Sequence, residues 1–320
     1  MEILAPYNSN NIEPYVNAGA SEFYLGFFDD QWYEDFGRFG DLNRMSGFKR
    51  FANSLTFDEM LAQIDIIKSK GKKAYVTMNA QHYSDIQLQS INKFMPKLKE
   101  HSCDGIITST PEMVQLTYCY GLNSVASTMC AVYNTRTACF FRDLGCKRII
   151  LPRDLSIREI ESIVNNTDNV EFELFAMRNG CVFSDSFCLG VHQNCGSLCG
   201  SLRLGVNHIV SQEYDFMERH NIELTDDLYR KHYKHFACSL CALYRFKELG
   251  ISALKVVGRA DAAEFLLYDI ALLYENIKVA QECKSEEEYL RRMILPKYSY
   301  NACKCGFSCY YPEVRFGEVQ

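Results

Sequence analysis

Short runs of apolar and β-branched residues recur along most of the chain, separated by longer stretches with helical periodicity. The eight strand candidates are Glu2–Ala5, Glu22–Leu25, Lys73–Met78, Gly105–Thr108, Ser124–Ser127, Arg148–Leu151, Val170–Phe175 and Ala253–Val257. Continuous apolar runs are typical of parallel strands that are covered on both faces. Eight β/α units in about 260 residues predict a (β/α)8, TIM-barrel-like α/β fold. A doubly wound open sheet is the alternative, because a strand count does not establish closure.

Helix-start signals support this alternation. The stretch Phe57–Lys70 opens on Thr56, repeats apolar residues at helical spacing and closes at Gly71. Ser156–Val164 follows a strand and a turn in the same way. The sequence therefore predicts helices that return the chain from one strand to the next.

Two segments interrupt this rhythm. Residues 27–55 are rich in aromatic and charged residues, and residues 178–240 contain many of the cysteines. Both follow strand candidates, so in a barrel both would extend from the C-terminal face, where active sites form. No internal repeat or low-complexity linker divides the chain. We expect one barrel domain over residues 1–283 with a cysteine-rich insertion at 178–241, followed by a C-terminal helix and cysteine-containing tail over 284–320.

Composition restricts the classes of function. The net charge of −6 gives no general electrostatic footprint for nucleic acid, although a local basic groove remains compatible with it. No run approaches the roughly 18–20 apolar residues of a membrane span. The N-terminus carries no secretory signal pattern. We expect a cytoplasmic protein without a membrane span.

Fifteen cysteines are the anomaly of this composition. In a large intracellular chain, grouped cysteines are more often metal or cluster ligands than disulfides. Six scattered cysteines are interpreted instead as buried structural thiols, because free cysteine is among the most buried residue types. These six are Cys103, Cys119, Cys130, Cys139, Cys146 and Cys283.

The strongest local signal is Cys181-x6-Cys188-x6-Cys195-x3-Cys199, followed by Cys238-x2-Cys241. Four thiolates can hold an iron–sulfur cluster or a tetrahedral zinc ion, so all six are candidate ligands. An iron–sulfur cluster is the preferred interpretation. Zinc is the alternative, since His232 and His235 precede Cys238 and Cys241 at a spacing that suits two imidazoles and two thiolates.

A third group, Cys303, Cys305 and Cys309, lies in the tail. These thiols could serve a second metal or cover the first. A structural or reactive tail is an equal alternative.

Polar residues near the predicted C-terminal ends of strands are candidates for substrate contact or catalysis. They are Asn79, His82, Asn134, Arg153, Asp154, Lys255 and Arg259. A salt bridge or helix cap is the structural alternative for each. The aromatic residues between Phe27 and Phe36 could stack on a ring or base, or form a hydrophobic lid. Neither a Gly-x-Ser-x-Gly elbow nor a His-Glu-x-x-His helix is present to indicate a protease.

Several segments together resemble the peptidase U32 family, also called collagenase-like proteases. They are Glu2–Pro6 with Ala18-Gly19-Ala20 and Tyr24-Leu25-Gly26, Ser127-Thr128 with Asn134, Leu151–Ser156, Cys181-x6-Cys188, and Leu240-Cys241 through Gly258-Arg259. Two positions depart from the family pattern. Asp154 stands where glutamate is usual, and Val257 replaces an acid in the closing strand. The cysteine-rich tail lies outside the pattern.

The resemblance implies a barrel-like fold and, from several relatives, oxygen-independent hydroxylation of ubiquinone precursors, transfer RNA or ribosomal RNA with a 4Fe–4S cluster. It implies Cys181, Cys188, Cys199 and Cys241 as ligands, with Cys195 and Cys238 as alternates. We therefore expect an iron–sulfur enzyme that hydroxylates or otherwise oxidises a small aromatic or RNA substrate. A U32-type peptidase and a non-catalytic cluster-bearing subunit with a homologous partner are the alternatives.

Overall fold

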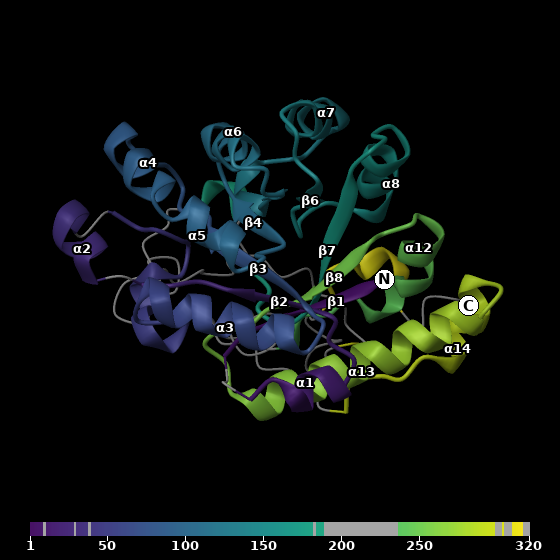
Figure 1. Cartoon of the computed structure of the whole chain (residues 1–320). Helices are drawn as coiled ribbons and strands as arrows, with labels where there is room; N and C mark the ends of the chain where they lie inside the picture. Colours follow the sequence, from purple (N-terminus) through teal and green to yellow (C-terminus); the bar gives the residue numbers. More distant parts are fainter. Residues whose placement is uncertain are drawn as a thin grey trace, which may run out of the picture.

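The computed structural model describes residues 1–8, 11–28, 30–37, 40–181, 184–188, 236–297, 303 and 309–315. Eight parallel strands close into a barrel in chain order (Figure 1). They are β1 (Glu2–Pro6), β2 (Glu22–Leu25), β3 (Lys73–Met78), β4 (Gly105–Thr108), β5 (Ser124–Ala126), β6 (Arg148–Ile150), β7 (Glu171–Met177) and β8 (Ala253–Val256). The barrel confirms the predicted fold class.

Closure comes from the pairing of β1 with both β2 and β8. Ile3 lies opposite Leu254 in this closing pair, and both side chains are buried. The open-sheet alternative is therefore wrong. All eight predicted strands are confirmed, with small differences at their ends. The largest difference is at the end of β7, which runs on to Met177 because a bulge after Phe175 lets it pair with Val256.

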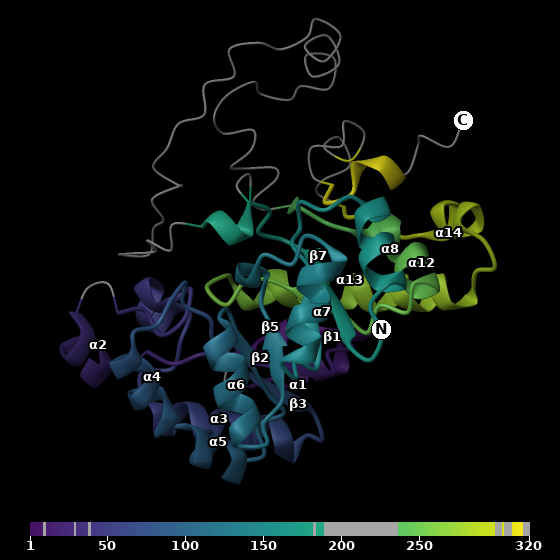
Figure 2. The same cartoon turned by 90° about the horizontal axis from the view of Figure 1, so that it is seen from above.

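Helices surround the barrel (Figures 1 and 2). They are α1 (Glu13–Asn17), α2 (Asp30–Phe36), α3 (Phe57–Ser69), α4 (Asp85–Asn92), α5 (Met95–Glu100), α6 (Pro111–Cys119), α7 (Thr135–Asp143), α8 (Ile157–Asn165), α12 (Leu243–Glu248), α13 (Ala263–Glu282) and α14 (Glu286–Arg292). The predicted starts of α3 and α8 are confirmed, because Thr56 accepts a bond from Glu59 N at 3.1 Å and Ser156 forms a capping box with Glu159. No helix of the described ranges is long and apolar enough to cross a membrane.

The scattered cysteines are mostly part of the core. Cys103, Cys130, Cys146 and Cys283 are buried, as predicted. Cys139 in α7 is only half-buried. The prediction is wrong for Cys119, which is exposed because it is the last residue of α6 and not part of that helix's buried face.

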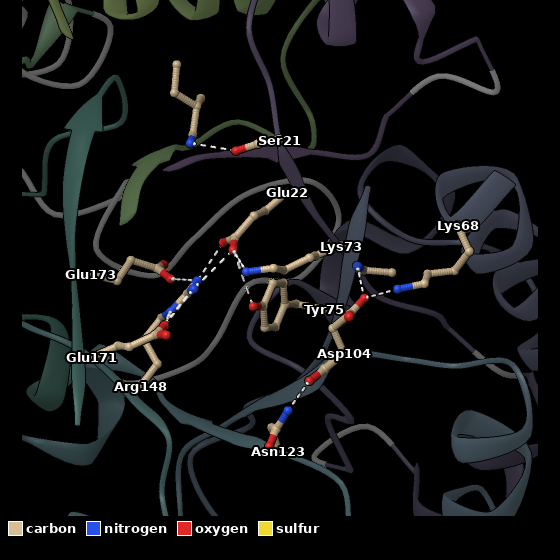
Figure 3. A network of polar contacts seen from close by, with 12 residues as sticks. Ser21, Glu22, Lys68, Lys73, Tyr75, Asp104, Asn123, Arg148, Glu171 and Glu173 are labelled. Carbon is tan, nitrogen blue, oxygen red and sulfur yellow. Dashed lines mark hydrogen bonds and ion pairs between the residues drawn. The ribbon is translucent and has the colours of Figure 1, made fainter. Parts of the chain in front are cut away.

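Charged residues fill the barrel interior near its N-terminal end (Figure 3). Arg148 donates to both oxygens of Glu22 at 2.6 and 3.0 Å and contacts Glu173 at 3.4 Å. Lys73 adds a bond of 3.1 Å to Glu22. Burial opposes ionisation of Glu22, but Arg148 and Lys73 outweigh it and lower its pKa. These groups satisfy one another, which is how a barrel core can hold charge.

The described part of the tail docks beside β7 and α8. Cys309 forms an isolated bridge with Cys238, and Tyr310 N donates to Cys238 O at 2.9 Å. Glu313 accepts from Ile157 N, the first residue of α8, at 2.7 Å. Figures 1 and 2 show the short helix η7 (Pro312–Val314) close to α12. The tail is thus held by main-chain and side-chain bonds to the barrel.

Candidate functional site

A buried carboxylate ties three parts of the barrel mouth together. Asp185 accepts 2.8 Å bonds from Arg44, in the segment after β2, and from Arg153, after β6. The Asp185 side chain has no solvent exposure. Burial opposes its ionisation, but the two guanidinium groups outweigh that effect and lower the pKa of Asp185. Two cations share one anion here, so the cluster of side chains carries a net positive charge.

Cys181 and Cys188 lie on either side of Asp185 in the sequence. Both are half-buried, and Asp185 lies between them in the short helix η4 (Asp185–Phe187). Cys181 interacts electrostatically with Arg153, and Cys188 with Arg44. Nearby guanidinium groups favour thiolates and other anionic ligands. The arrangement places two thiols of the predicted cluster group in a positively charged setting at the mouth.

The chain reaches this segment through a strained turn. Arg178 and Asn179, directly after β7, have φ angles of 60° and 54°, which glycine adopts more readily than other residues. The side chain of Arg178 pairs with the buried Asp269 of α13. Asn179 Nδ2 donates to Asp261 at 2.7 Å, and the Asn179 carbonyl accepts from Arg153. Strain of this kind persists where the surroundings hold it, often at functional sites.

Arg259, after β8, is buried at the mouth among neutral partners. It donates to Asn53 at 3.2 Å, to Thr77 at 3.0 Å and to Asn43 at 3.1 Å. Burial lowers the pKa of Arg259 to about 10. Gly26 makes room for it, because a Cβ there would overlap the Arg259 guanidinium. The guanidinium keeps its charge at neutral pH, where an anionic or carbonyl group of a ligand would be a fitting partner.

Asp154 belongs to a second polar group at the same end. Tyr133 donates to its carboxylate at 2.9 Å and also contacts Ser184 and Ser186, which flank Asp185. Asp154 is itself exposed. Thus Arg153 contacts the Cys181–Cys188 segment directly through Asp185, and Asp154 is linked to the same segment through Tyr133.

The remaining predicted candidates have structural contacts or lie apart. Asn134 caps α7 by accepting from Thr137 N at 3.0 Å. Asn79 accepts from Arg44 N at 3.2 Å, and His82 is exposed after β3. Lys255 is buried in β8, where its ammonium lies 3.3 Å from the Glu173 carboxylate. Asn134 is therefore a helix cap and Lys255 forms a salt bridge, as the structural alternatives to a catalytic role predicted.

The aromatic segment after β2 is divided between core and surface. Phe27 and Trp32 are buried, which favours the hydrophobic interpretation for them. Tyr33 is exposed and lies with Phe28 around Lys49 Nζ, which is 5.7 Å from each ring. Because the rings of Phe27 and Trp32 are buried, neither offers an exposed face on which a ring or base of a substrate could stack.

Four thiols from two segments of the chain line one small pocket close to the end of β7. They are Cys238, Cys241, Cys303 and Cys309. Burial, followed by the nearness of the other three thiols, raises the pKa of Cys238 well above its usual range. Cys181 and Cys188 are not among the lining residues. The predicted ligands Cys195 and Cys199, the histidines His232 and His235, and Cys305 lie outside the described residues.

Sequence reasoning missed the residues that organise the site: Arg44, Arg178, Asp185 and Asp269. A signal existed for Asp185, because an acid between two candidate ligand cysteines needs a cation if the segment is buried. The identity of that cation was not readable, since Arg44 is 141 residues away in the chain.

The protein is a closed (β/α)8 barrel with cysteines and arginines gathered at its mouth. The model of peptidase family U32 matches residues 8–315, and the chain belongs to this family.

An uncharacterized protease of Methanocaldococcus jannaschii is 25% identical over 87% of this chain. The tRNA hydroxylation protein P1 of Bacillus subtilis is 24% identical over 90% of it. The chain spans 65% of the length of each of these relatives. A solved U32 peptidase matches with a TM-score of 0.44 at 17% identity, covering 55% of this chain and 69% of that one.

Proposed function

We propose that this protein is an iron–sulfur enzyme of the U32 family that takes part in the oxygen-independent hydroxylation of transfer RNA. The observation that carries the proposal is the buried Arg44–Asp185–Arg153 ion pair, which holds the Cys181–Cys188 segment against the barrel mouth. The relatives named tRNA hydroxylation protein supply the substrate class. A tRNA substrate would place the reaction in the cytoplasm.

The donor set fits a 4Fe–4S cluster. Thiolates are the usual ligands of such clusters, and a cluster with four thiolates carries net negative charge. Cys181 and Cys188 would supply two ligands, with Cys199 as the third. The fourth would be Cys241, with Cys195 and Cys238 as alternates. The positive environment of Arg44 and Arg153 suits that charge. When bound, the cluster would supply electron transfer.

The protein's own side chains would bind and orient the substrate. Arg259 presents a buried guanidinium whose hydrogen-bond partners are neutral, so it is suited to an anionic or carbonyl group. Asp185 would fix the two arginines, and Tyr133 would hold Asp154 at the rim. The strained turn at Arg178 and Asn179 would set the direction in which the cysteine segment leaves β7.

A peptidase is the second candidate, because one relative is named a protease. A peptidase needs an activated nucleophile or water. Of the two histidines that the structure describes, His101 pairs with Asp65 on the surface and His82 is exposed. The described buried thiols Cys103, Cys130 and Cys146 have raised pKa values, chiefly from burial, which disfavours thiolate nucleophiles.

Nucleoside analysis of tRNA tests the proposal. In anaerobically grown cells, deletion of the gene is expected to remove a nucleoside that is heavier by one oxygen atom than its unmodified form. The wild-type gene and the Cys119→Ser variant should restore it, whereas Cys188→Ser should not. An unchanged nucleoside profile in the deletion strain would contradict a tRNA substrate. Cleavage of peptides by the iron-free protein would instead favour the peptidase.

A further inference from the structure

The chain just before α3 carries positive charge without acids. Residues 42–57 contain Arg44, Lys49 and Arg50 but neither aspartate nor glutamate. Lys49 and Arg50 are exposed, and neither forms an ion pair with a carboxylate of the described residues. This stretch therefore contrasts with the net charge of −6 of the whole chain and provides a local attraction for an anionic partner.

Aromatic side chains lie among these cations. Phe51 is 60% exposed, and the Arg50 guanidinium lies 5.6 Å from the centre of its ring. Lys49 Nζ lies 5.7 Å from the ring centres of Phe28 and Tyr33. Exposed rings beside cations are the combination with which proteins stack unpaired bases and follow a nucleic-acid backbone. We call Lys49, Arg50 and Phe51 the cationic tip.

Tyr33 marks the edge of this surface. It belongs to α2, where the exposed acids Glu34 and Asp35 follow it directly. These carboxylates would repel a phosphate backbone, so a nucleic acid would lie on the side of the cationic tip.

Hydrogen bonds hold the backbone of the cationic tip in a fixed shape. Asn53 Nδ2 donates to the carbonyls of Met45 and Lys49 at 2.9 and 3.0 Å. Asn43 Nδ2 donates to Asn53 Oδ1 at 2.9 Å and joins the two ends of the loop. Lys49 has a φ of 44°, which glycine adopts more readily. Because these bonds order a strained backbone before a ligand arrives, less entropy is lost on binding.

The loop that carries the cationic tip lies beside the cysteine segment. Arg44, in the same loop, forms its 2.8 Å ion pair with Asp185, between Cys181 and Cys188 in sequence. A strand bound at the cationic tip would thus lie at the same end of the barrel as the cysteines. RNA suits this surface better than a protein does, because charged residues without counter-charges are depleted from the centres of protein interfaces.

We propose that the cationic tip binds a single-stranded loop of transfer RNA. Lys49 and Arg50 contact backbone phosphates, and the Phe51 ring stacks on an unpaired base. Arg44 remains paired with Asp185 and positions the loop. The inference rests on the proposed function, from which it takes the class of RNA.

Binding of tRNA from the deletion strain to the full chain, purified anaerobically, tests the proposal. Fluorescence anisotropy at several salt concentrations measures the affinity and its dependence on salt. Removing both cations, by Lys49→Ala with Arg50→Ala, should weaken binding and lower the slope of log Kd against log salt by roughly 1 for each cation. Phe51→Ala should weaken binding by about tenfold at every salt concentration, the usual effect of losing one stacked base.

Matched controls separate local effects from general ones. Lys70→Ala with Arg291→Ala makes the same change in net charge at exposed positions after α3 and in α14, and Phe140→Ala removes an exposed ring from α7. These controls should bind tRNA as the wild type does. All variants should keep the iron content and the unfolding midpoint of the wild type, because the replaced side chains are exposed. Phe51→Leu keeps an apolar side chain without an aromatic face and should bind nearly as weakly as Phe51→Ala.

The possible failures of the two proposals can be told apart. Wild-type affinity and salt slope in the variants of the cationic tip would overturn this inference and leave the proposed function standing. A wild-type protein that does not bind tRNA would also overturn it, and the nucleoside profile of the deletion strain would decide the proposed function separately. Loss of a co-purifying protein from Phe51→Ala, with tRNA binding unchanged, would assign the surface to a protein partner and overturn the inference as well.

Discussion

At the scale of single residues, Asp185 explains most of the geometry of the mouth. It is a carboxylate without solvent exposure that holds two arginines from different β/α units. Such a group stabilises the fold only while both partners are present, because an unpaired buried charge is strongly unfavourable. The cysteines on either side of Asp185 therefore depend on it for their position.

Replacement of Asp185 by asparagine should lower the free energy of unfolding by about 3–5 kcal/mol, the usual effect of removing one partner of a buried ion pair. Because asparagine has nearly the same volume as aspartate, the loss of stability would come from leaving the charges of Arg44 and Arg153 without a counter-charge. Urea unfolding monitored by circular dichroism measures it. Asp154→Asn is the control, because Asp154 is exposed, and it should change stability by about 1 kcal/mol at most. Equal stability of Asp185→Asn and the wild type would contradict the account.

The pH dependence of stability provides a second check. The pKa of Asp185 is lower in the folded protein than in the unfolded chain, because two arginines outweigh its burial. The stabilisation is therefore complete above the unfolded pKa, about 3.9, and is lost as the pH falls through the lower folded value. Wild-type stability should fall more steeply than that of Asp185→Asn below about pH 4. Parallel curves from urea titrations at several pH values would show that Asp185 is not ionised in the fold.

At the scale of elements, the ends of β2 and β8 meet across the barrel mouth. Gly26 follows β2 and Arg259 follows β8, and a Cβ at Gly26 would overlap the guanidinium and lie 2.6 Å from Thr77 Oγ1. The strand ends can approach only because one residue has no side chain. This contact fixes Arg259 against Asn43 and Asn53, which anchor the segment after β2.

Gly26→Ala should destabilise the protein by about 1–3 kcal/mol, as overpacking of a filled interior does. It should also displace Arg259 from Asn43 and Asn53 and so reduce the proposed hydroxylation activity. A double-mutant cycle with Arg259→Ala locates the clash, since the alanine at position 26 should be less destabilising once the guanidinium is gone. Thermal unfolding of the four proteins measures the cycle. Additive effects would show that Gly26 and Arg259 do not interact.

The strands were predictable from sequence because each is a short apolar run covered on both faces, and the helix starts were predictable from Thr56 and Ser156. Closure was only an expectation, because the pairing of Ile3 with Leu254 joins the first and last strands of the barrel. At the candidate site, the sequence indicated Cys181, Cys188 and Arg153, which the structure places at the barrel mouth, whereas their role in binding a cluster stays a prediction. The Arg44–Asp185 contact and the approach of Cys309 to Cys238 were not predictable, because no local pattern encodes a contact between distant segments.

At the scale of the whole molecule, the two ends of the barrel hold different arrangements of charged side chains. At the N-terminal end of the interior, Arg148 forms ion pairs with Glu22 and Glu173, so these charges neutralise one another and stabilise the core (Figure 3). The mouth holds arginines that share one carboxylate or have neutral partners. A net charge of −6 for the chain thus coexists with a positive site at one end. This polarity fits the C-terminal face of a (β/α)8 barrel as the functional face.

The proposed function depends on a cysteine-ligated iron–sulfur cluster at that face. The most direct test is the content of iron and acid-labile sulfide in anaerobically purified wild-type protein, in Cys188→Ser and in the surface control Cys119→Ser. We predict about four irons and four sulfides per chain in the wild type and the control, and loss of most of both in Cys188→Ser. A wild-type protein without iron, or a Cys188→Ser variant with its full complement, would contradict the account.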